Sequence, residues 1–485
     1  MNKMSIPEFK LENFKNRFER EIVKAMRDLK VPGISVIITQ DDNIIYERSF
    51  GLRESGKNVK PATPDTLYGI SSITKSFTCL GILQLHEQGK LDINDPVSKY
   101  IHFELGFEDN PILIKHLMSH SSGVPALNTF YFSQKNQKLV KTTPPEFPMG
   151  TWDDFYFHIN DAKSEILSPP GTKYYYWNAG FVLLGQIIEK VSGIKYEEYI
   201  EKNILSPLSM NRSTFSNKIA EEDSDVSRGF DYGLNKDVIF RDAKDLLSGP
   251  FIAGAGGIIS SVREMTNYLQ CNLNGGEYKG VRILGEELIQ EMWKAHNQNV
   301  QAKYFHFYPD LTATYGYGWK TYHNFFGHRI ITHGGNSGVS GGMVGFIPEL
   351  KLTFALLQNV NWIPLHLMFV AFALIFGKDP DEEIPFFKRR KHLRSLAGRY
   401  ETYKKTITVQ VQNRNGLLYI IDENWVDKIT TPLIPKNNDP EVMEFYAPTP
   451  YGRMDVPFTK HIDGHITLDW ERHVLHQKTI DLDED

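Results

Sequence analysis

The N-terminal part of the chain changes from a helical to a strand-like pattern of apolar positions. Apolar side chains spaced for one helix face predict an amphipathic helix, with its buried stripe at Phe14, Phe18, Ile22, Met26 and Leu29. Pro32-Gly33 ends this helix, and two apolar runs at 34–39 and 44–50 flank the turn at 41–43, which predicts a hairpin. A helix followed by a hairpin indicates an antiparallel sheet that is covered by helices.

The segment after position 71 is apolar on almost every side and continues to Gly89. This pattern predicts a central, buried helix that ends at a glycine cap. Weaker periodicity predicts further helices at 181–191, 262–269 and 284–295, and strands at 329–332, 342–347 and 352–358. The region 127–166 is rich in proline and aromatic residues, and we expect a long loop over a cleft there.

The C-terminal quarter has a different pattern. The apolar run 363–376 is shorter than the ~20 residues that a membrane span needs, so it predicts a buried helix and no membrane contact. An acidic and then basic stretch at 379–394 predicts a linker. Short strand-like runs between polar turns follow, so we expect one domain at 1–378 and a small all-β barrel at 395–485.

Composition narrows the classes of function. The chain has 485 residues and a formal net charge of −5 without a long basic run, which gives no reason to expect a nucleic-acid partner. The first twenty residues carry scattered charges and no apolar core of a signal peptide, so we expect a cytoplasmic protein. Cys79 and Cys271 belong to no metal-binding motif, and His116 and His120 lack a third ligand nearby. We therefore expect no metal and no cofactor, and a turn at the two histidines.

Ser72 and Lys75 are the first candidates for chemistry. Residues three apart lie on one face of a helix, about one turn from each other. A serine hydroxyl needs a neighbour that accepts its proton, and a lysine amine can do so when burial lowers its pKa. The spacing alone occurs by chance in many chains, but a lysine inside a buried helix must be paired or neutral.

Two further motifs follow in the chain. Tyr176-x-Asn178 lies just before a predicted helix, and His333-Gly334-Gly335 lies at the end of a predicted strand. The run 338–342 also matches G-x-S-x-G, the nucleophile elbow of α/β-hydrolases. That elbow requires a helix after the serine, whereas the residues that follow here predict strands, so we expect no elbow.

In this order, Ser72-x-x-Lys75, Tyr176-x-Asn178 and His333-Gly334-Gly335 resemble the penicillin-recognising serine hydrolases, which include class C β-lactamases, D-aminopeptidases and penicillin-binding-protein-like esterases. The resemblance covers residues 10–377 and implies an α+β fold: an antiparallel sheet flanked by helices, plus an all-helical subdomain. The chain departs from the triple S-x-x-K, S-D-N and K-T-G at the second and third motifs. The segment from Leu396 resembles, more weakly, the lipocalin-like β-barrels that follow some of these domains.

The resemblance implies a role for each motif residue. Ser72 would be the acylated nucleophile, and Lys75 and Tyr176 would share the proton transfers, with the identity of the base left open. Asn178 would bind the substrate amide and steady Lys75. The backbone N–H groups of Ser72 and Asn336 would form the oxyanion hole, with Gly334 and Gly335 beside it.

These roles imply a serine hydrolase that forms an acyl-enzyme on small amide, peptide (D-amino-acid peptides included) or ester substrates. A low-turnover binding or assembly protein with the same fold is the alternative. The barrel would cover the cleft, form a homo-oligomer or act only as a spacer. His333 replaces the lysine of the third motif, and a neutral imidazole predicts weak recognition of substrate carboxylates.

Overall fold

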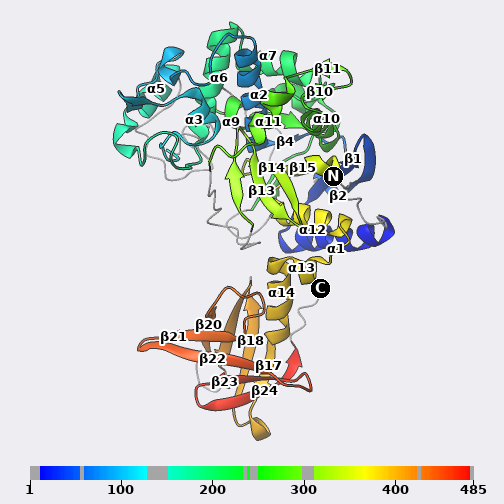
Figure 1. The fold of residues 1–485 in the computed structure, drawn as a ribbon. Helices are drawn as coiled ribbons and strands as arrows, with labels where there is room; N and C mark the ends of the chain where they lie inside the picture. The colour runs from blue at the N-terminus through cyan, green and yellow to red at the C-terminus, as the bar shows by residue number, and fades with distance from the viewer. Residues whose placement is uncertain are drawn as a thin grey trace. The chain divides into compact units, whose positions relative to one another are not determined.

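The chain forms two compact units in this computed structural model, which describes residues 11–54, 59–127, 151–232, 238–240, 250–297, 311–414, 416–422 and 428–480. The described residues up to 369 form the first unit and those from 370 the second, so the boundary falls inside helix α12 (Leu365–Ile375) (Figure 1). The first unit combines an antiparallel sheet with helices, and the second is a closed barrel. This architecture confirms the predicted fold class.

An eight-stranded antiparallel sheet forms the middle of the first unit. Its strand order is β12-β13-β14-β15-β16-β1-β2-β3. The strands are β12 (Ala313–Tyr315), β13 (Lys320–Phe325), β14 (His328–Asn336), β15 (Gly341–Ile347), β16 (Leu352–Gln358), β1 (Gly33–Gln40), β2 (Asn43–Glu54) and β3 (Lys60–Pro61). The predicted hairpin is β1 and β2, which pair directly, and β1 also pairs with β16 from the far end of the unit.

Strand register decides which residues face which layer of helices. His333 pairs with Val344, Val344 with Ala355, and Ala355 with Ile37, so these four side chains form one cross-strand row. Val344, Ala355 and Ile37 belong to the hydrophobic core that also contains helix α2. The sheet therefore presents His333 to the side of the catalytic candidates.

The opposite face of the sheet packs against α1 (Leu11–Asp28) and the start of α12. Phe14 and Phe18, one turn apart on α1, contact the ring of Tyr46 in β2 at centroid distances of 5.3 and 5.6 Å. Phe369 of α12 packs on Phe325 of β13. No described helix is long and apolar enough to cross a membrane.

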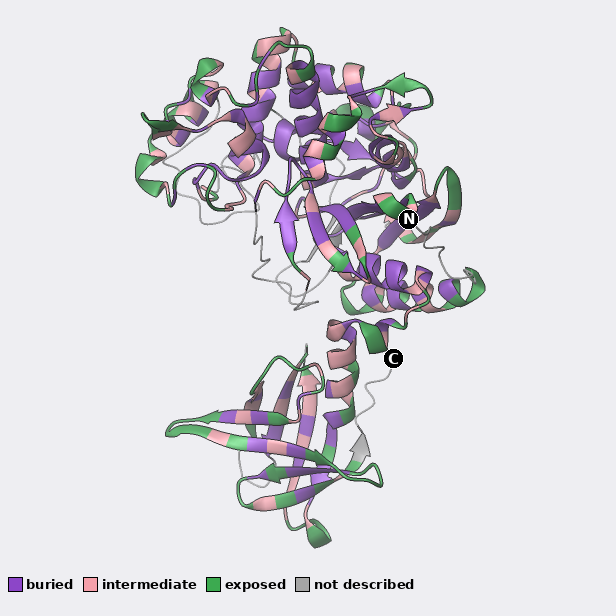
Figure 2. Ribbon diagram, viewed as in Figure 1, coloured by how far each residue is buried: buried purple, intermediate pink, exposed green. Residues whose placement is uncertain are grey.

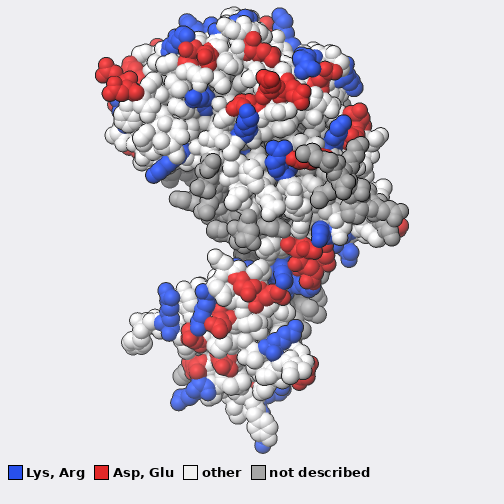
Figure 3. Space-filling view, in the orientation of Figure 1, with Lys and Arg blue, Asp and Glu red and all other residues white. Residues whose placement is uncertain are grey.

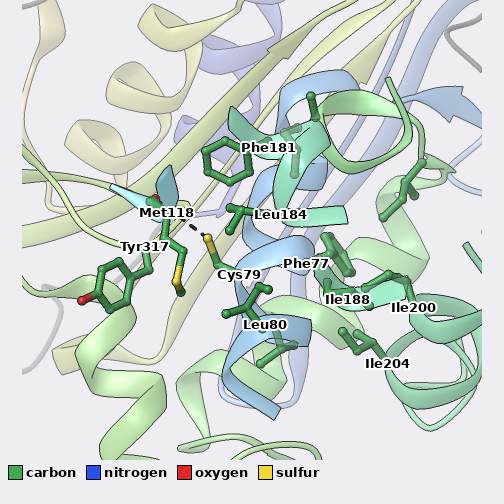
Figure 4. Packing of buried hydrophobic residues seen from close by; sticks show 14 of the residues in the cluster. Phe77, Cys79, Leu80, Met118, Phe181, Leu184, Ile188, Ile200, Ile204 and Tyr317 are labelled. Atoms are coloured by element: carbon green, nitrogen blue, oxygen red, sulfur yellow. Dashed lines mark hydrogen bonds between the residues drawn. The ribbon is translucent and has the colours of Figure 1, made fainter. Parts of the chain in front are cut away.

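Helix α2 (Thr74–Glu87) lies at the centre of the helical layer, and all its residues from Thr74 to Leu85 are buried (Figure 2). Around Cys79 the core is formed by side chains from several helices, including Phe181, Leu184 and Ile200 (Figure 4). Cys79 is fully buried, with its Sγ 3.9 Å from the carbonyl oxygen of Met118, as expected for a small apolar residue.

The other helices of this layer are mostly short. They are α3 (Ile114–Met118), α5 (Trp152–Asn160), α6 (Asn178–Ser192), α7 (Tyr196–Ile200), α8 (Asn217–Glu222), α9 (Ala253–Gly256), α10 (Val262–Leu273) and α11 (Glu286–Trp293). Two-stranded pairs complete it: β4 (Tyr68–Gly69) with β9 (Ile259–Ser260), β5 (Gly106–Phe107) with β6 (Asn110–Pro111), β7 (Phe230–Tyr232) with β8 (Val238–Phe240), and β10 (Glu277–Tyr278) with β11 (Val281–Arg282). Most of the loop predicted over 127–166 lies outside the described residues.

In the second unit, eight antiparallel strands in sequence order close into a barrel, because the last strand pairs with the first. They are β17 (Gly398–Glu401), β18 (Thr408–Arg414), β19 (Leu417–Asp422), β20 (Ile429–Pro435), β21 (Glu444–Thr449), β22 (Gly452–Lys460), β23 (Ile466–Trp470) and β24 (His473–Ile480). Both units carry interspersed positive and negative side chains on the face shown in Figure 3.

The segment predicted as a linker, 379–394, is helical. It forms α13 (Pro380–Glu383) and α14 (Pro385–Leu396). Asp379 caps α13 by accepting the N–H of Asp381, and a proline opens each helix. The segment is rich in charged residues and has little apolar periodicity, so its sequence did not predict these helices. The domain limits at 378 and 395 stay a prediction.

Candidate active site

Ser72 lies in a 3₁₀ turn, Ser71–Ile73, that runs directly into α2. The preceding residue, Ser71, has a φ of +52°, a left-handed conformation that is uncommon for residues with a Cβ. Ser72 is partly exposed and Lys75 is fully buried. Lys75 Nζ donates a hydrogen bond to Ser72 Oγ over 3.0 Å. The α-helix begins later than the sequence predicts, but the predicted contact between serine and lysine is present.

The amine of Lys75 is enclosed by apolar and neutral groups. Its Nζ also donates to the carbonyl oxygen of Ala255 at 2.7 Å, and it lies 4.9 Å from the ring centroid of Tyr176 and 5.5 Å from that of Phe181. Burial lowers the pKa of Lys75 well below its usual range, and no carboxylate among the described residues contributes to that pKa. The environment therefore favours the neutral amine.

Helix α9 supplies the carbonyl that holds Lys75. Its residues are the Ala-Gly-Ala-Gly run, and a Cβ on Gly254 would lie 2.3 Å from the carbonyl oxygen of Phe181, so this close approach requires glycine. Thr78 Oγ1 donates to the carbonyl oxygen of Gly254 at 2.7 Å, beside the Lys75 contact with Ala255. The glycine-rich run thus turns two successive carbonyls toward α2.

Tyr176 and Asn178 lie at the start of α6, which begins at Asn178, as predicted. Burial raises the pKa of the Tyr176 hydroxyl, and a hydrogen bond with Ser72 offsets part of this rise. Asn178 Oδ1 is buried and has no hydrogen-bond partner within the described part of the chain. The contact that holds Lys75 is therefore with Ala255, and the predicted support from Asn178 does not occur in this structure.

Strand β14 brings the third motif beside Ser72. A Cβ on Gly335 would lie 2.0 Å from the carbonyl oxygen of Ile70 and 3.2 Å from the backbone nitrogen of Ser72. The strand thus passes against the 3₁₀ turn with no room for a side chain. Asn336 ends the strand, and its Oδ1 accepts the N–H of Gly338.

Both ring nitrogens of His333 have partners. Nδ1 lies 2.8 Å from the carbonyl oxygen of Gly334, which can only accept, so Nδ1 carries the proton. Nε2 therefore accepts the hydroxyl of Tyr315, at 2.9 Å. Burial is the main cause that lowers the pKa of His333 to about 3. His333 is thus a neutral imidazole, and its N–H is already used within the protein.

The G-x-S-x-G run is not a nucleophile elbow. Ser340 is buried in the turn between β14 and β15, and its Oγ donates to the carbonyl oxygen of Gly69 at 2.9 Å. The following residues form β15, as the sequence predicts. His116 accepts the N–H of Leu113 at the start of α3. Across the described residues, no group of three His, Cys, Asp or Glu side chains is arranged to hold a metal ion.

Comparison with known proteins places this geometry in a family. The model of the Beta-lactamase family matches residues 18–362, most of the chain. The chain belongs to the beta-lactamase family. The chain is similar to Protein flp of Staphylococcus aureus (strain MRSA252), 27% identical over 337 residues, and to Penicillin-binding protein 4* of Bacillus subtilis (strain 168), 26% identical over 421 residues. These alignments cover 68% and 82% of this chain, and 60% and 81% of the relatives, so the chain spans less than two thirds of the staphylococcal protein.

Several solved structures resemble the chain as well. The octameric penicillin-binding protein homologue from Pyrococcus abyssi is 34% identical, with a TM-score of 0.81 over 95% of this chain and 99% of that one. EstCE1, a hydrolase with promiscuous acyltransferase activity, is 18% identical with a TM-score of 0.60 over 76% of this chain and 99% of its own, which shows a shared fold. A second family model, the Pab87 octamerisation domain, matches residues 380–476, which include most of the barrel.

Proposed function

We propose that the protein is a serine hydrolase that cleaves small ester, amide or peptide bonds through an acyl-enzyme on Ser72. The observation that carries this proposal is the 3.0 Å hydrogen bond between Ser72 Oγ and Lys75 Nζ, with the amine buried away from the carboxylates of the described residues. A partly exposed hydroxyl beside a buried, neutral amine is the arrangement that an activated serine needs.

The pKa directions favour Lys75 over Tyr176 as the base. Burial lowers the pKa of the amine and raises that of the phenol, so it favours the neutral form of both groups. A pair of ammonium and phenolate, which the charge of a protonated lysine would support, is disfavoured by the same burial. In this proposal Ser72 Oγ attacks the acyl carbon while its proton passes to Lys75 Nζ.

The other proton transfers complete the reaction. The leaving group departs with a proton relayed through the Tyr176 hydroxyl, which is replenished from Lys75. Water then attacks the Ser72 ester, its proton passes to the same amine, and the acid is released as the serine recovers its proton. The backbone N–H groups of Ser72 and Asn336 would stabilise the oxyanion, since Gly335 holds β14 against the 3₁₀ turn.

Neutral substrates suit this site better than carboxylates. His333 is neutral and its ring nitrogens are occupied by Gly334 and Tyr315, so the third motif offers no cation to a substrate carboxylate. Esters, amides and blocked peptides, D-amino-acid derivatives among them, are the substrates we propose. Asn178, whose Oδ1 is buried without a partner, would accept a hydrogen bond from the substrate amide.

The barrel would assemble copies of the chain. Residues 380–476 match a model named for octamerisation, and the Pyrococcus abyssi homologue is octameric. We propose a homo-oligomer that forms through the second unit. Light scattering of the full chain, compared with a chain ending before α13, tests this: the full chain should be oligomeric, and a monomeric full chain would contradict it.

Labelling with a fluorophosphonate tests the hydrolase proposal. Intact-mass analysis should show one adduct per chain in the wild type and in Ser340→Ala, and none in Ser72→Ala. Ser340 is the matched control because it lies in a hydrolase-like motif but is buried in a turn. An adduct that persists in Ser72→Ala, or its absence from the wild type at millimolar probe, would overturn the proposal. The alternative, a binding protein with little turnover, would gain support from the second result.

A further inference from the structure

His120 holds the backbone on both sides of Tyr176. Its carbonyl oxygen accepts the N–H of Tyr175 at 2.8 Å, and its ring Nδ1 accepts the N–H of Trp177 at 3.1 Å. The same ring lies against Tyr176 itself, with the two centroids 4.2 Å apart. One residue, 55 positions or more earlier in the chain, thus makes three contacts with a three-residue segment whose central residue is the candidate phenol.

The hydrogen bond to Trp177 decides the tautomer of His120. A backbone N–H can only donate, so Nδ1 carries the lone pair and the proton is on Nε2. Nε2 is buried and has no hydrogen-bond partner in the described chain. Burial is the main cause that lowers the pKa of His120, which keeps Nδ1 available as an acceptor.

The backbone of His120 is also unusual. Its φ is +57°, in the left-handed region that histidine visits less readily than glycine. The residue follows α3 and is only 1% exposed, and its N–H donates to the carbonyl oxygen of Leu117. A left-handed backbone combined with a buried ring aims the carbonyl and Nδ1 at the same segment. Glycine would relieve the backbone but would lose the ring acceptor.

We propose that His120 is the positioning residue for Tyr176, an inference that rests on the proposed function for its catalytic meaning. His120 does not contact Ser72 or the reacting carbonyl; it fixes the segment that carries the phenol. A displacement of about 1 Å at a reacting group lowers rates by roughly 100-fold, so loss of the hydrogen bond from Trp177 to the ring should act on kcat more than on KM. A buried histidine that served only for packing would instead change stability.

Two variants separate these roles. Asn tolerates a positive φ, and its side-chain oxygen can occupy a position close to that of Nδ1, so His120→Asn retains an acceptor. His120→Leu introduces an apolar side chain of similar size and removes the Nδ1 acceptor. We expect kcat for a neutral ester to fall about 10- to 100-fold in His120→Leu, with KM changed less than threefold, and to fall about threefold in His120→Asn.

A double-mutant cycle with Tyr176→Phe tests whether His120 acts through the phenol. If it does, His120→Leu should lower kcat much less in the Tyr176→Phe background than in the wild type. Equal losses in both backgrounds, or a His120→Asn variant as slow as His120→Leu, would overturn the proposal. Thermal melting of every variant identifies any that fail to fold.

Hydrogen exchange gives a readout that needs no turnover. The amide of Trp177, whose acceptor is the ring Nδ1, should exchange slowly in the wild type and in His120→Asn, and faster in His120→Leu, while peptides from the barrel stay unchanged. Unaltered exchange at the Trp177 amide in a folded His120→Leu would refute the positioning role of the His120 ring. An inactive wild type that fails to label at Ser72 would refute the proposed function instead, and the exchange result would still decide the role of His120.

Discussion

Replacing Gly335 with alanine should disable the site without changing any group that takes part in the chemistry. The new Cβ would lie 2.0 Å from the carbonyl oxygen of Ile70, a backbone atom that cannot rotate away. Carbon and oxygen require more than 3 Å, so β14 and the 3₁₀ turn must separate by about 1 Å. The proposed oxyanion donors of Ser72 and Asn336 lie on these two segments and would move apart.

The size of the effect follows from that displacement. Loss of one oxyanion donor costs about 100- to 1000-fold in kcat in acyl-transfer enzymes, or roughly 3 kcal/mol of transition-state stabilisation. We expect kcat/KM of Gly335→Ala for a p-nitrophenyl ester to fall at least 100-fold. Overpacking should also lower the free energy of unfolding by about 1–3 kcal/mol, which thermal melting measures.

The adjacent glycine provides the matched control. A Cβ on Gly334 would meet the Ile363 Cγ2 atom at 2.8 Å and the Met343 Cε atom at 3.3 Å, both at the ends of side chains that can shift. We expect Gly334→Ala to lose less than tenfold in kcat/KM. A Gly335→Ala enzyme within tenfold of the wild type, or equal losses in the two variants, would refute the proposed contact between β14 and the oxyanion site.

Three other results are expected. Lys75→Met should abolish acylation of Ser72 while the protein stays folded. The pKa of Lys75 is lower in the folded state than its unfolded value of ~10.4, so between these two pKa values the unfolded chain binds more protons than the folded chain. The free energy of unfolding of the wild type should therefore rise with pH in that range, and that of Lys75→Met should change less. Denaturation at several pH values measures this, and parallel curves for the two proteins would contradict it. The ratio of kcat/KM for neutral and carboxylate-bearing esters should favour the neutral ester and stay constant from pH 5 to 8, because the pKa of His333 is about 3; a strong carboxylate preference would count against this. Neither Cys79 nor Cys271 should react with a thiol dye until the protein unfolds, since both are buried and burial raises both pKa values; rapid labelling of the native protein would show otherwise.

Sequence spacing predicted the contacts that lie within one element. Ser72 and Lys75 are three residues apart, so helical geometry alone brings them together, and the burial of α2 follows from its apolar residues. The strands around Gly342 were predictable for the same reason, and they excluded Ser340 as a nucleophile. The local periodicity of apolar residues thus predicts secondary structure and the contacts within one helix or strand.

Contacts between distant segments were not predictable. Ala255 lies 180 positions after Lys75 and contributes a backbone carbonyl, which any residue type could supply. The role of His120 depends on a positive φ and on backbone N–H groups more than 50 positions away. Its place in a polar turn after a short helix gave no indication of that role.

The acyl-enzyme on Ser72 is the central claim, and trapping it with a substrate tests that claim most directly. The wild type would be mixed with a neutral ester that deacylates slowly, quenched in acid within the first turnover and digested for peptide mapping by mass spectrometry. We expect the acyl mass on Ser72 in a stoichiometry that matches the burst of released alcohol. An acyl group on another residue, or turnover with Ser72 unmodified at every time point, would contradict the account.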